Sequence, residues 1–301
     1  MSIEAPVGRQ YEIGGRPVWA YRSGEGVPSV VFLPGGGAVG LDYWHLQQSA
    51  AELTTSVVYD RTGTGWSRRE ARPLSSAETV DELRELLRAM EIPAPYVLVG
   101  HSLGGLFARH YASRFPAEVA GLLLIETAHE DYAAAMPAEL EELRGAFDPD
   151  QALPDELPEK ALQFYRDLFG RMMAGWPAEI REPLVTRHVS MTWLRDGFAP
   201  VKYLDDYLGE IRQAPPLPDV PVILLTATGI DDFKRAVLVG ESESLLQKEI
   251  EAKKQLYADF AASLPRGEHR LVDGVGHASI AFAGEDAILR AIRDLVARAA
   301  G

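Results

Sequence analysis

Residues 96–105 read Tyr96-Val97-Leu98-Val99-Gly100-His101-Ser102-Leu103-Gly104-Gly105, and this stretch decides the fold. It opens with four β-favouring apolar residues, and a helix-like run follows it over 106–111. This order predicts a strand, a sharp turn and a helix, with Ser102 at the turn. Glycine is required at positions 100 and 104, because a side chain at either position would clash with the neighbouring strand or helix. We therefore expect Ser102 to be exposed at the carboxyl edge of a sheet and at a helix N-terminus, where free N–H groups favour negative charge.

A Gly-x-Ser-x-Gly motif between a strand and a helix resembles the nucleophile elbow of the α/β-hydrolase family. The resemblance implies an α/β fold in which a mostly parallel central sheet is flanked by helices. It also implies a serine nucleophile, followed along the chain by an acidic residue and then by a histidine base. The rest of the chain can be compared with these expectations.

Short apolar segments alternate with segments of helical spacing on both sides of this motif. The apolar segments are continuous rather than alternating with polar residues, which favours a parallel sheet covered on both faces. The helix over 76–90 has its apolar residues on one face, and Ser76 is its predicted N-cap. The predicted strands cover 11–13, 18–22, 29–33, 55–59, 96–99, 121–125, 221–226 and 269–272, and the other predicted helices cover 103–115, 244–264 and 283–299.

The strand pattern stops between residues 128 and 218. This stretch contains only helical or irregular segments and is rich in methionine and aromatic residues. In α/β-hydrolases an insertion at this place forms a cap over the active site. We therefore predict a core domain from residues 1–127 and 219–301, with a helical cap, 128–218, between strands six and seven. The apolar residues of the cap predict an apolar pocket above Ser102.

Composition restricts the partners and the chemistry. The chain has 301 residues, of which 47% are hydrophobic, a formal net charge of -14 and no cysteine. The charge argues against nucleic acid and anionic membranes, and the lack of cysteine excludes disulfides and thiolate chemistry. No basic leader and no apolar run near the ~18 residues of a membrane span is visible. We expect a soluble cytoplasmic protein that acts on a small-molecule apolar acyl substrate and needs neither cofactor nor metal. The sequence leaves the formation of a homodimer open.

A serine hydroxyl needs a base within hydrogen-bond distance, and the base needs a carboxylate that orients it. Among seven histidines, His277 alone follows a late strand in a glycine-rich turn, Val272-Asp273-Gly274-Val275-Gly276-His277. The base of an α/β-hydrolase lies in such a turn after the last strand, so the resemblance makes His277 the base. His101 adjoins the nucleophile, but its side chain should leave the turn in the opposite sense and serve as support.

Two places offer the carboxylate. Glu126 ends the buried segment Leu122-Leu123-Leu124-Ile125-Glu126 and should lie at the catalytic edge of the sheet. Some α/β-hydrolases, including certain dehalogenases and lactone hydrolases, take their acid from this strand. Asp231 and Asp232 follow the next predicted strand, in the loop that most members of the family use. The loop from there to His277 is unusually long, so we rank Glu126 first, Asp231 second and Asp232 third.

Catalysis also needs N–H donors aimed at the developing oxyanion. One should be the N–H of Leu103, just after the nucleophile. The other should come from Pro34-Gly35-Gly36-Gly37, where the resemblance places the donor on Gly36. Pro34 stands where the family usually has histidine, which affects the anchoring of this loop more than its donor. The turn Asp60–Ser67 resembles a structural turn of the family.

These residues predict a serine hydrolase that cleaves a small or medium apolar ester, lactone or thioester through an acyl-enzyme on Ser102. Because fold does not determine function, an aminopeptidase, a C–C bond hydrolase and a non-catalytic ligand-binding homologue remain alternatives. A peptidase would need a carboxylate in the cap to bind an amino terminus. The cap offers Glu139, Glu141, Glu142 and Asp196.

Overall fold

The computed structural model describes residues 4–70, 72–146, 155–237 and 242–299. Within them the strands form one sheet of eight, in the order β1-β2-β4-β3-β5-β6-β7-β8. All pairs from β4 to β8 are parallel, and β1 and β2 pair antiparallel with their neighbours. The strands are β1 (Arg9–Ile13), β2 (Arg16–Ser23), β3 (Ser29–Leu33), β4 (Ser56–Tyr59), β5 (Tyr96–His101), β6 (Val119–Ile125), β7 (Val222–Ala227) and β8 (Gly267–Val272).

Both faces of the sheet are buried, which explains the continuous apolar strands. In β3 every residue is buried; Val30 and Phe32 belong to one hydrophobic cluster, whereas Val31 and Leu33 belong to the other. Successive side chains of a strand point to opposite faces, so a strand covered on both sides must be apolar throughout. The predicted α/β fold with a mostly parallel sheet is therefore confirmed.

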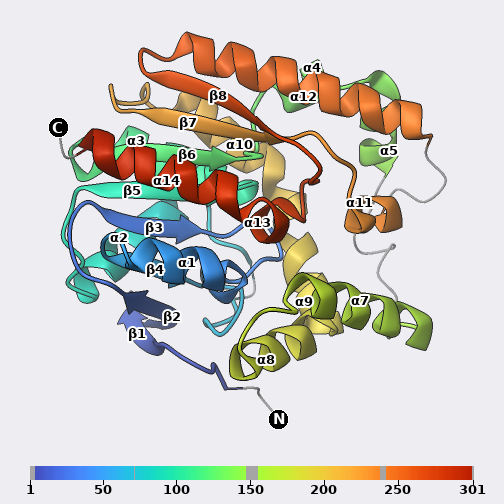
Figure 1. Ribbon diagram of the computed structural model, residues 1–301, viewed down its shortest axis with the longest axis horizontal. Coiled ribbons are helices and arrows are strands. Elements are labelled where there is room, and N and C mark those ends of the chain that lie inside the picture. Colours follow the sequence, from blue (N-terminus) through green and yellow to red (C-terminus); the bar gives the residue numbers. More distant parts are fainter. Residues whose placement is uncertain (1–3, 71, 147–154, 238–241, 300–301) are drawn as a thin grey trace.

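Helices cover the two faces. Figure 1 shows α1 (Trp44–Ala51) and α14 (Glu285–Ala299) in front of the sheet, and α14 packs on β6. The opposite face carries α2 (Ser76–Ala89) and α3 (Leu103–Arg114), while α12 (Glu243–Ser263) packs along β7 and β8. Short elements connect them: η1 (Gly40–Tyr43), η2 (Pro116–Glu118), α11 (Asp232–Val237) and α13 (Ile280–Ala283).

Helix α2 begins one residue earlier than its predicted cap allows. Ser75, not Ser76, is the N-cap: its hydroxyl accepts from the N–H of Glu78, whose carboxylate accepts in turn from the N–H of Ser75. This reciprocal pair needs a spacing of three residues, which only the first serine has to Glu78. The Ser76 hydroxyl is buried and lies 2.6 Å from His110 Nδ1.

The described residues between β6 and β7 form helices and irregular segments, and no strand, as the sequence predicts. Their two ends nevertheless pack on the core: α4 (Tyr132–Ala135) contacts α12, and α10 (Leu204–Gln213) contacts α2 and α3. Three helices in between, α7 (Glu159–Met172), α8 (Ala178–His188) and α9 (Met191–Phe198), lie together at one side of the sheet (Figure 1). The remaining elements are α5 (Ala138–Ala146) and η3 (Ala199–Tyr203). The division into core and cap domains stays a prediction.

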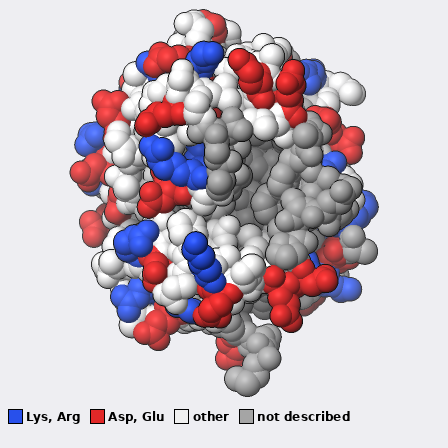
Figure 2. Space-filling view, turned by 90° about the vertical axis from the view of Figure 1, so that its right-hand side faces the viewer, with Lys and Arg blue, Asp and Glu red and all other residues white. Residues whose placement is uncertain are grey.

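Acidic and basic side chains are interspersed over the described part of the face shown in Figure 2. In the part of the chain that the structure describes, no helix combines the length and the apolar character needed to cross a bilayer.

Candidate active site

The strand, turn and helix around Ser102 adopt the predicted geometry. Ser102 ends the turn between β5 and α3 with a left-handed backbone (φ 52°, ψ -119°). A Cβ on Gly104 would lie 1.9 Å from the carbonyl oxygen of Leu33, and one on Gly100 would lie 2.5 Å from that of Gly104. Both contacts are shorter than any real Cβ tolerates, so these glycines allow the helix to approach the sheet beside the serine.

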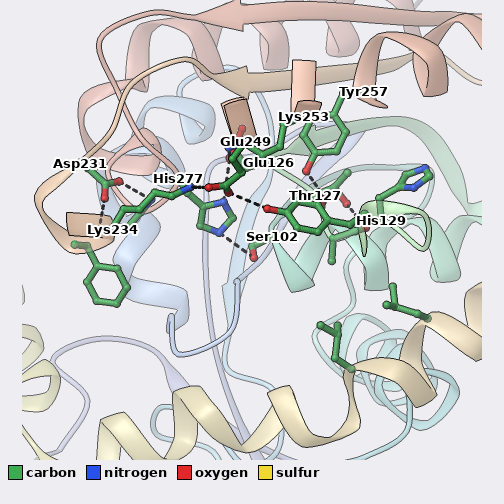
Figure 3. A pocket seen from close by; sticks show the side chains of 16 residues that line it. Ser102, Glu126, Thr127, His129, Asp231, Lys234, Glu249, Lys253, Tyr257 and His277 are labelled. Carbon is green, nitrogen blue, oxygen red and sulfur yellow. Dashed lines mark hydrogen bonds and ion pairs between the residues drawn. The ribbon is translucent and has the colours of Figure 1, made fainter. Parts of the chain in front are cut away.

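His277 lies between Ser102 and Glu126 (Figure 3). Its Nε2 is 3.1 Å from Ser102 Oγ, and its Nδ1 is 3.0 Å from Glu126 Oε2. A neutral imidazole with its proton on Nδ1 donates to the carboxylate and accepts from the serine hydroxyl. The structure thus brings together the serine, the histidine and the first-ranked of the three acidic candidates.

The backbone of Glu126 turns its side chain into this position. Glu126 has φ 48°, a left-handed conformation that is rare for residues with a Cβ and that clusters at functional sites. Its N–H donates to the carbonyl of Leu225, and its Oε1 accepts from the N–H of Ala227, so β7 holds both ends of the residue. The carboxylate is wholly buried, which makes its interactions stronger than they would be in water.

A lysine completes the surroundings of this carboxylate. Lys253 Nζ on α12 lies 2.6 Å from Glu126 Oε2, the oxygen that also faces His277. Burial alone would raise the pKa of Glu126, but the charge of Lys253 and the hydrogen bond to His277 outweigh it and lower that pKa to about 2. Glu126 is therefore ionised at any pH at which the protein would work.

Asp231 has a different environment. Its Oδ2 accepts from the N–H groups of Ala278 (2.8 Å) and Ser279 (3.0 Å), and its Oδ1 accepts from the N–H of Lys234 (2.8 Å). The carboxylate thus binds the main chain just after His277 instead of the imidazole. Asp232 begins α11 with an exposed side chain that pairs with Arg171. The structure does not bring Asp232 to His277.

The two predicted oxyanion donors lie on segments that pass next to the serine. Leu103 is the first residue of α3, so its N–H has no acceptor within the helix. The loop of Gly36 passes close to the nucleophile, because a Cβ on Gly35 would lie 3.3 Å from the Cβ of Ser102. The guanidinium of buried Arg61 donates to the carbonyls of Pro34 and Gly35. This arginine anchors the loop in the absence of the family's histidine.

His101 connects this loop to the turn of His277. Its Nε2 is 3.0 Å from the carbonyl oxygen of His277, and its Nδ1 is 2.9 Å from the hydroxyl of Tyr43, which also accepts weakly from the N–H of Gly35. Burial, reinforced by the nearby His277, lowers the pKa of His101 to about 3, so the ring is neutral. A neutral ring with its proton on Nε2 satisfies both bonds. Its side chain thus supports the turn of His277.

Comparison with known proteins places these observations in a family. The model of a family described as "Alpha/beta hydrolase family" matches residues 30–291, which is most of the chain. This chain belongs to the alpha/beta hydrolase family.

Named relatives of this chain include an esterase. A stretch of 131 residues is 33% identical to the pimeloyl-[acyl-carrier protein] methyl ester esterase of Chromobacterium violaceum, over 40% of the chain and 49% of the esterase. The chain also matches an uncharacterized protein of Bacillus subtilis, 27% identical over 114 residues, which cover 38% of the chain and 45% of the relative. The chain thus spans about half the length of these curated relatives.

Solved structures share the fold over almost the whole chain. One of them, described as Est816, an N-acyl homoserine lactone degrading enzyme, is 18% identical, with a TM-score of 0.56 over 95% of this chain and 99% of that one. At this identity the likeness concerns the fold alone.

Two cavities of the protein meet at Ser102 and His277. The larger, about 360 Å³, extends between the loop after β6 and helices α11 and α12, and Figure 3 shows its side chains. It combines apolar residues such as Leu204, Leu208 and Phe233 with the charged residues around Glu126. The smaller, about 220 Å³, lies between the glycine loop and the helices α7 and α9. Its wall is largely apolar and includes Leu168, Phe169, Met172, Trp193, Ala281 and Phe282.

Two polar contacts hold the helices of the insertion against the glycine loop. Trp193 Nε1 donates to the carbonyl of Gly37 (2.6 Å), and His188 Nε2 lies 2.6 Å from Asp42 Oδ1. His188 and Asp42 are both buried. The wall of the smaller cavity is therefore attached to the loop that carries Gly36.

Other groups of interest lie elsewhere. Glu139 and Glu142 are exposed on α5, Glu141 is half-buried there, and the side chain of Asp196 lies outside the described residues. Among the described residues, no three His, Cys, Asp or Glu side chains are grouped in a way that could hold a metal ion.

Sequence reasoning missed Arg61 and Lys253. Arg61 lies in the turn that resembles a family motif, so its contact with the glycine loop 34–37 could have been sought there. Lys253 carries no local signal: it is one lysine in a long amphipathic helix, 127 residues after Glu126. Only the packing of α12 against β7 brings the two together.

Proposed function

We propose that the protein is a serine hydrolase that cleaves an ester, lactone or thioester through an acyl-enzyme on Ser102. The observation that carries the proposal is the chain of two short contacts, from Ser102 Oγ to His277 Nε2 and from His277 Nδ1 to Glu126 Oε2. These contacts lie where two cavities meet, so a bound acyl group can reach the hydroxyl.

In the first half of the reaction the oxygen of Ser102 attacks the carbonyl carbon as its proton passes to His277 Nε2. The imidazolium that forms is stabilised by the Glu126 carboxylate. The tetrahedral intermediate then collapses: the bond to the leaving oxygen or sulfur breaks, and that atom takes the proton from His277. The acyl group stays on Ser102 as an ester.

In the second half water replaces the leaving group. His277 takes a proton from the water as its oxygen attacks the acyl-enzyme, and returns the proton to Ser102 Oγ when the intermediate collapses. The products are a carboxylic acid and the free enzyme, so no electrons are gained or lost.

The N–H groups of Leu103 and Gly36 would stabilise the oxyanion of both intermediates. Removing one such donor from a serine protease costs about 3 to 4 kcal/mol of barrier. Arg61 supports this step indirectly, since its bonds to Pro34 and Gly35 hold the loop in place.

The shape of the two cavities favours an acyl substrate of small to medium size. The apolar wall of α7 and α9 suits an alkyl or aromatic group, while the larger cavity has room for the other part of the ester. The esterase relative is consistent with a carboxylic ester as substrate. The acyl chain length remains to be measured.

The test is hydrolysis of p-nitrophenyl esters from acetate to decanoate by the wild type and by Ser102→Ala. We expect turnover by the wild type and its loss in the variant, with unchanged folding by circular dichroism. Ser263→Ala, an exposed serine at the end of α12, is the matched control and should retain full activity.

Other results would select among the alternatives. Hydrolysis of amino-acid amides but not of esters would indicate a peptidase, and cleavage of a vinylogous diketone would indicate a C–C bond hydrolase. If no substrate turns over and a fluorophosphonate does not label Ser102, the proposal fails and a ligand-binding role replaces it.

A further inference from the structure

The ammonium of Lys253 occupies an unusual place for a lysine. Its side chain is 5% exposed, and that of its partner Glu126 is fully buried. Nζ lies 2.6 Å from Glu126 Oε2, and Nδ1 of His277 lies 3.0 Å from the same oxygen. One carboxylate oxygen thus faces two cationic or potentially cationic groups.

Burying a lysine ammonium in this way costs free energy of folding, so its presence here needs an explanation. Removing an ammonium from water costs several kcal/mol, and a close ion pair offsets this only partly. The neighbouring Lys254 shows the ordinary alternative, since it forms a solvent-exposed pair with Glu251 one turn away. A structural salt bridge could have been placed on that surface of α12.

The neighbouring carboxylate, Glu249, pairs with other groups and leaves Lys253 to interact with Glu126. Glu249, one helical turn before Lys253 on α12, forms an ion pair with Lys234 from α11. Its other oxygen accepts from the hydroxyl of Tyr132, at 2.8 Å. Figure 3 shows Glu249 and Lys253 beside Glu126. Because its two carboxylate oxygens face Lys234 and Tyr132, Glu249 does not draw the ammonium away from Glu126.

We propose that Lys253 is a positioning residue, which locks the carboxylate of Glu126 in its ionised form toward His277 and limits the protonation of His277. This inference rests on the proposed function, because it assigns a role within the same group of residues. The first part follows from the 2.6 Å contact, which restrains the rotation of the carboxylate. The second follows from charge: a cation at the shared oxygen opposes a second cation on the imidazole.

The two parts have separable consequences. Loss of the restraint lowers kcat, because the imidazole is less well oriented. Loss of the positive charge favours a proton on His277, so the acid limb of the rate profile moves to higher pH. A purely structural lysine would affect stability and kcat without moving that limb.

Other titratable groups face the cluster of Lys253, Glu126 and His277. These groups are the same in the wild type and in every variant compared. They come from every element packed against it, namely His101 on β5, Tyr132 on α4, Asp231 after β7, Lys234 on α11, Glu249 and Tyr257 on α12, and His269 on β8. Because none of them is altered, a shift between wild type and variant reports the removed ammonium.

The experiment compares pH profiles of kcat and kcat/KM for the wild type, Lys253→Met and Lys254→Met with a p-nitrophenyl ester. For Lys253→Met we expect a fall in kcat of about 10- to 100-fold with little change in KM. We expect its acid limb to move up by about one pH unit. Lys254→Met, the same change at the next position, should match the wild type in both.

A second variant covers the case in which Lys253→Met does not fold. Lys253→Gln can still donate a hydrogen bond to Glu126 but carries no charge. Its kcat should be closer to that of the wild type, while its acid limb moves up as in Lys253→Met. An unmoved acid limb in a folded Lys253 variant overturns the inference, even if kcat falls.

The result for the wild type, measured alongside the variants, separates a failure of this inference from a failure of the proposed function. If the wild type hydrolyses no ester, the same comparison is made with the pH dependence of Ser102 labelling by a fluorophosphonate. If the wild type is not labelled either, both the function and the inference fail. If it is active and the Lys253 variants keep its profile, only the inference fails.

Discussion

The loop after β6 and the loop after β7 each carry a carboxylate to the same turn, and they use it differently. Glu126 directly follows the last residue of β6 and contacts the imidazole of His277. Asp231 lies four residues beyond the end of β7 and contacts the N–H groups of Ala278 and Ser279. One carboxylate orients the ring, and the other holds the main chain that carries the ring.

The difference shows that position at the edge of a sheet does not by itself assign a role. Glu126 can reach the ring because its left-handed backbone turns its side chain toward β7, whose Ala227 N–H holds it. The loop of Asp231 instead runs beside the histidine turn, where the N–H of Gly229 donates to the carbonyl of Val275. From there the nearest donors for Asp231 are backbone groups.

Glu126→Gln should have the largest effect and test the comparison most directly. An amide in place of the carboxylate favours the wrong tautomer of His277 and leaves Lys253 without a counter-charge. By analogy with the same change in a serine protease, we expect kcat/KM to fall by about 10⁴. Ester hydrolysis measures it, with Glu130→Gln as a control on the same loop, bound to Arg109 instead. Full activity of Glu126→Gln together with an inactive Asp231 variant would reverse the two roles.

The second prediction concerns the pH dependence of stability. The pKa of Glu126 is about 2 in the folded protein, below its ordinary value of 4.5. The ionised group therefore stabilises the fold above about pH 5, and this contribution is lost as pH falls toward 2. The shift corresponds to at most about 3 kcal/mol. Urea unfolding should give a higher free energy of unfolding for the wild type than for Glu126→Gln at pH 5, and this difference should shrink by pH 3. A difference that stays constant with pH would contradict the prediction.

Asp231→Ala should have a smaller effect, on stability and catalysis together. It removes the acceptor of three backbone N–H groups, those of Lys234, Ala278 and Ser279. We expect a loss of about 2 kcal/mol in the free energy of unfolding, because these donors lose their partner. A displaced His277 should lower kcat by about 10- to 100-fold. Wild-type stability would show that the turn is held by other contacts.

Tyr257→Phe should have the smallest effect and concerns the loop after β6. The buried hydroxyl of Tyr257 donates to the carbonyl of Thr127, next to Glu126, at 2.7 Å. Its loss should cost about 1 kcal/mol in the free energy of unfolding and leave the acid limb in place. Thermal unfolding measures the loss of stability, and the pH profile of kcat shows whether the acid limb moves. A larger loss of kcat than in Asp231→Ala would mean that the loop after β6 is the more easily displaced of the two.

Much of the fold follows from local sequence. The continuous apolar segments predicted the strands of a two-sided sheet, because each such segment must be buried on both faces. Errors arose where neighbouring residues compete for one role, as with Ser75 and Ser76 at the start of α2. There the spacing to Glu78 decides, and it favours Ser75.

The sequence by itself determined the strand order along the chain, the turn at Ser102 and the glycine-rich turn at His277, because these depend on residues close to one another in sequence. Tertiary structure decided between the candidate carboxylates, and it alone decided what anchors the glycine loop 34–37 and where Lys253 lies. Glu126 and Asp231 each follow a buried strand, and the path of each loop decides which of them meets the ring. Lys253 reaches Glu126 because α12 packs along β7 and β8, and no local pattern encodes a contact across 127 residues.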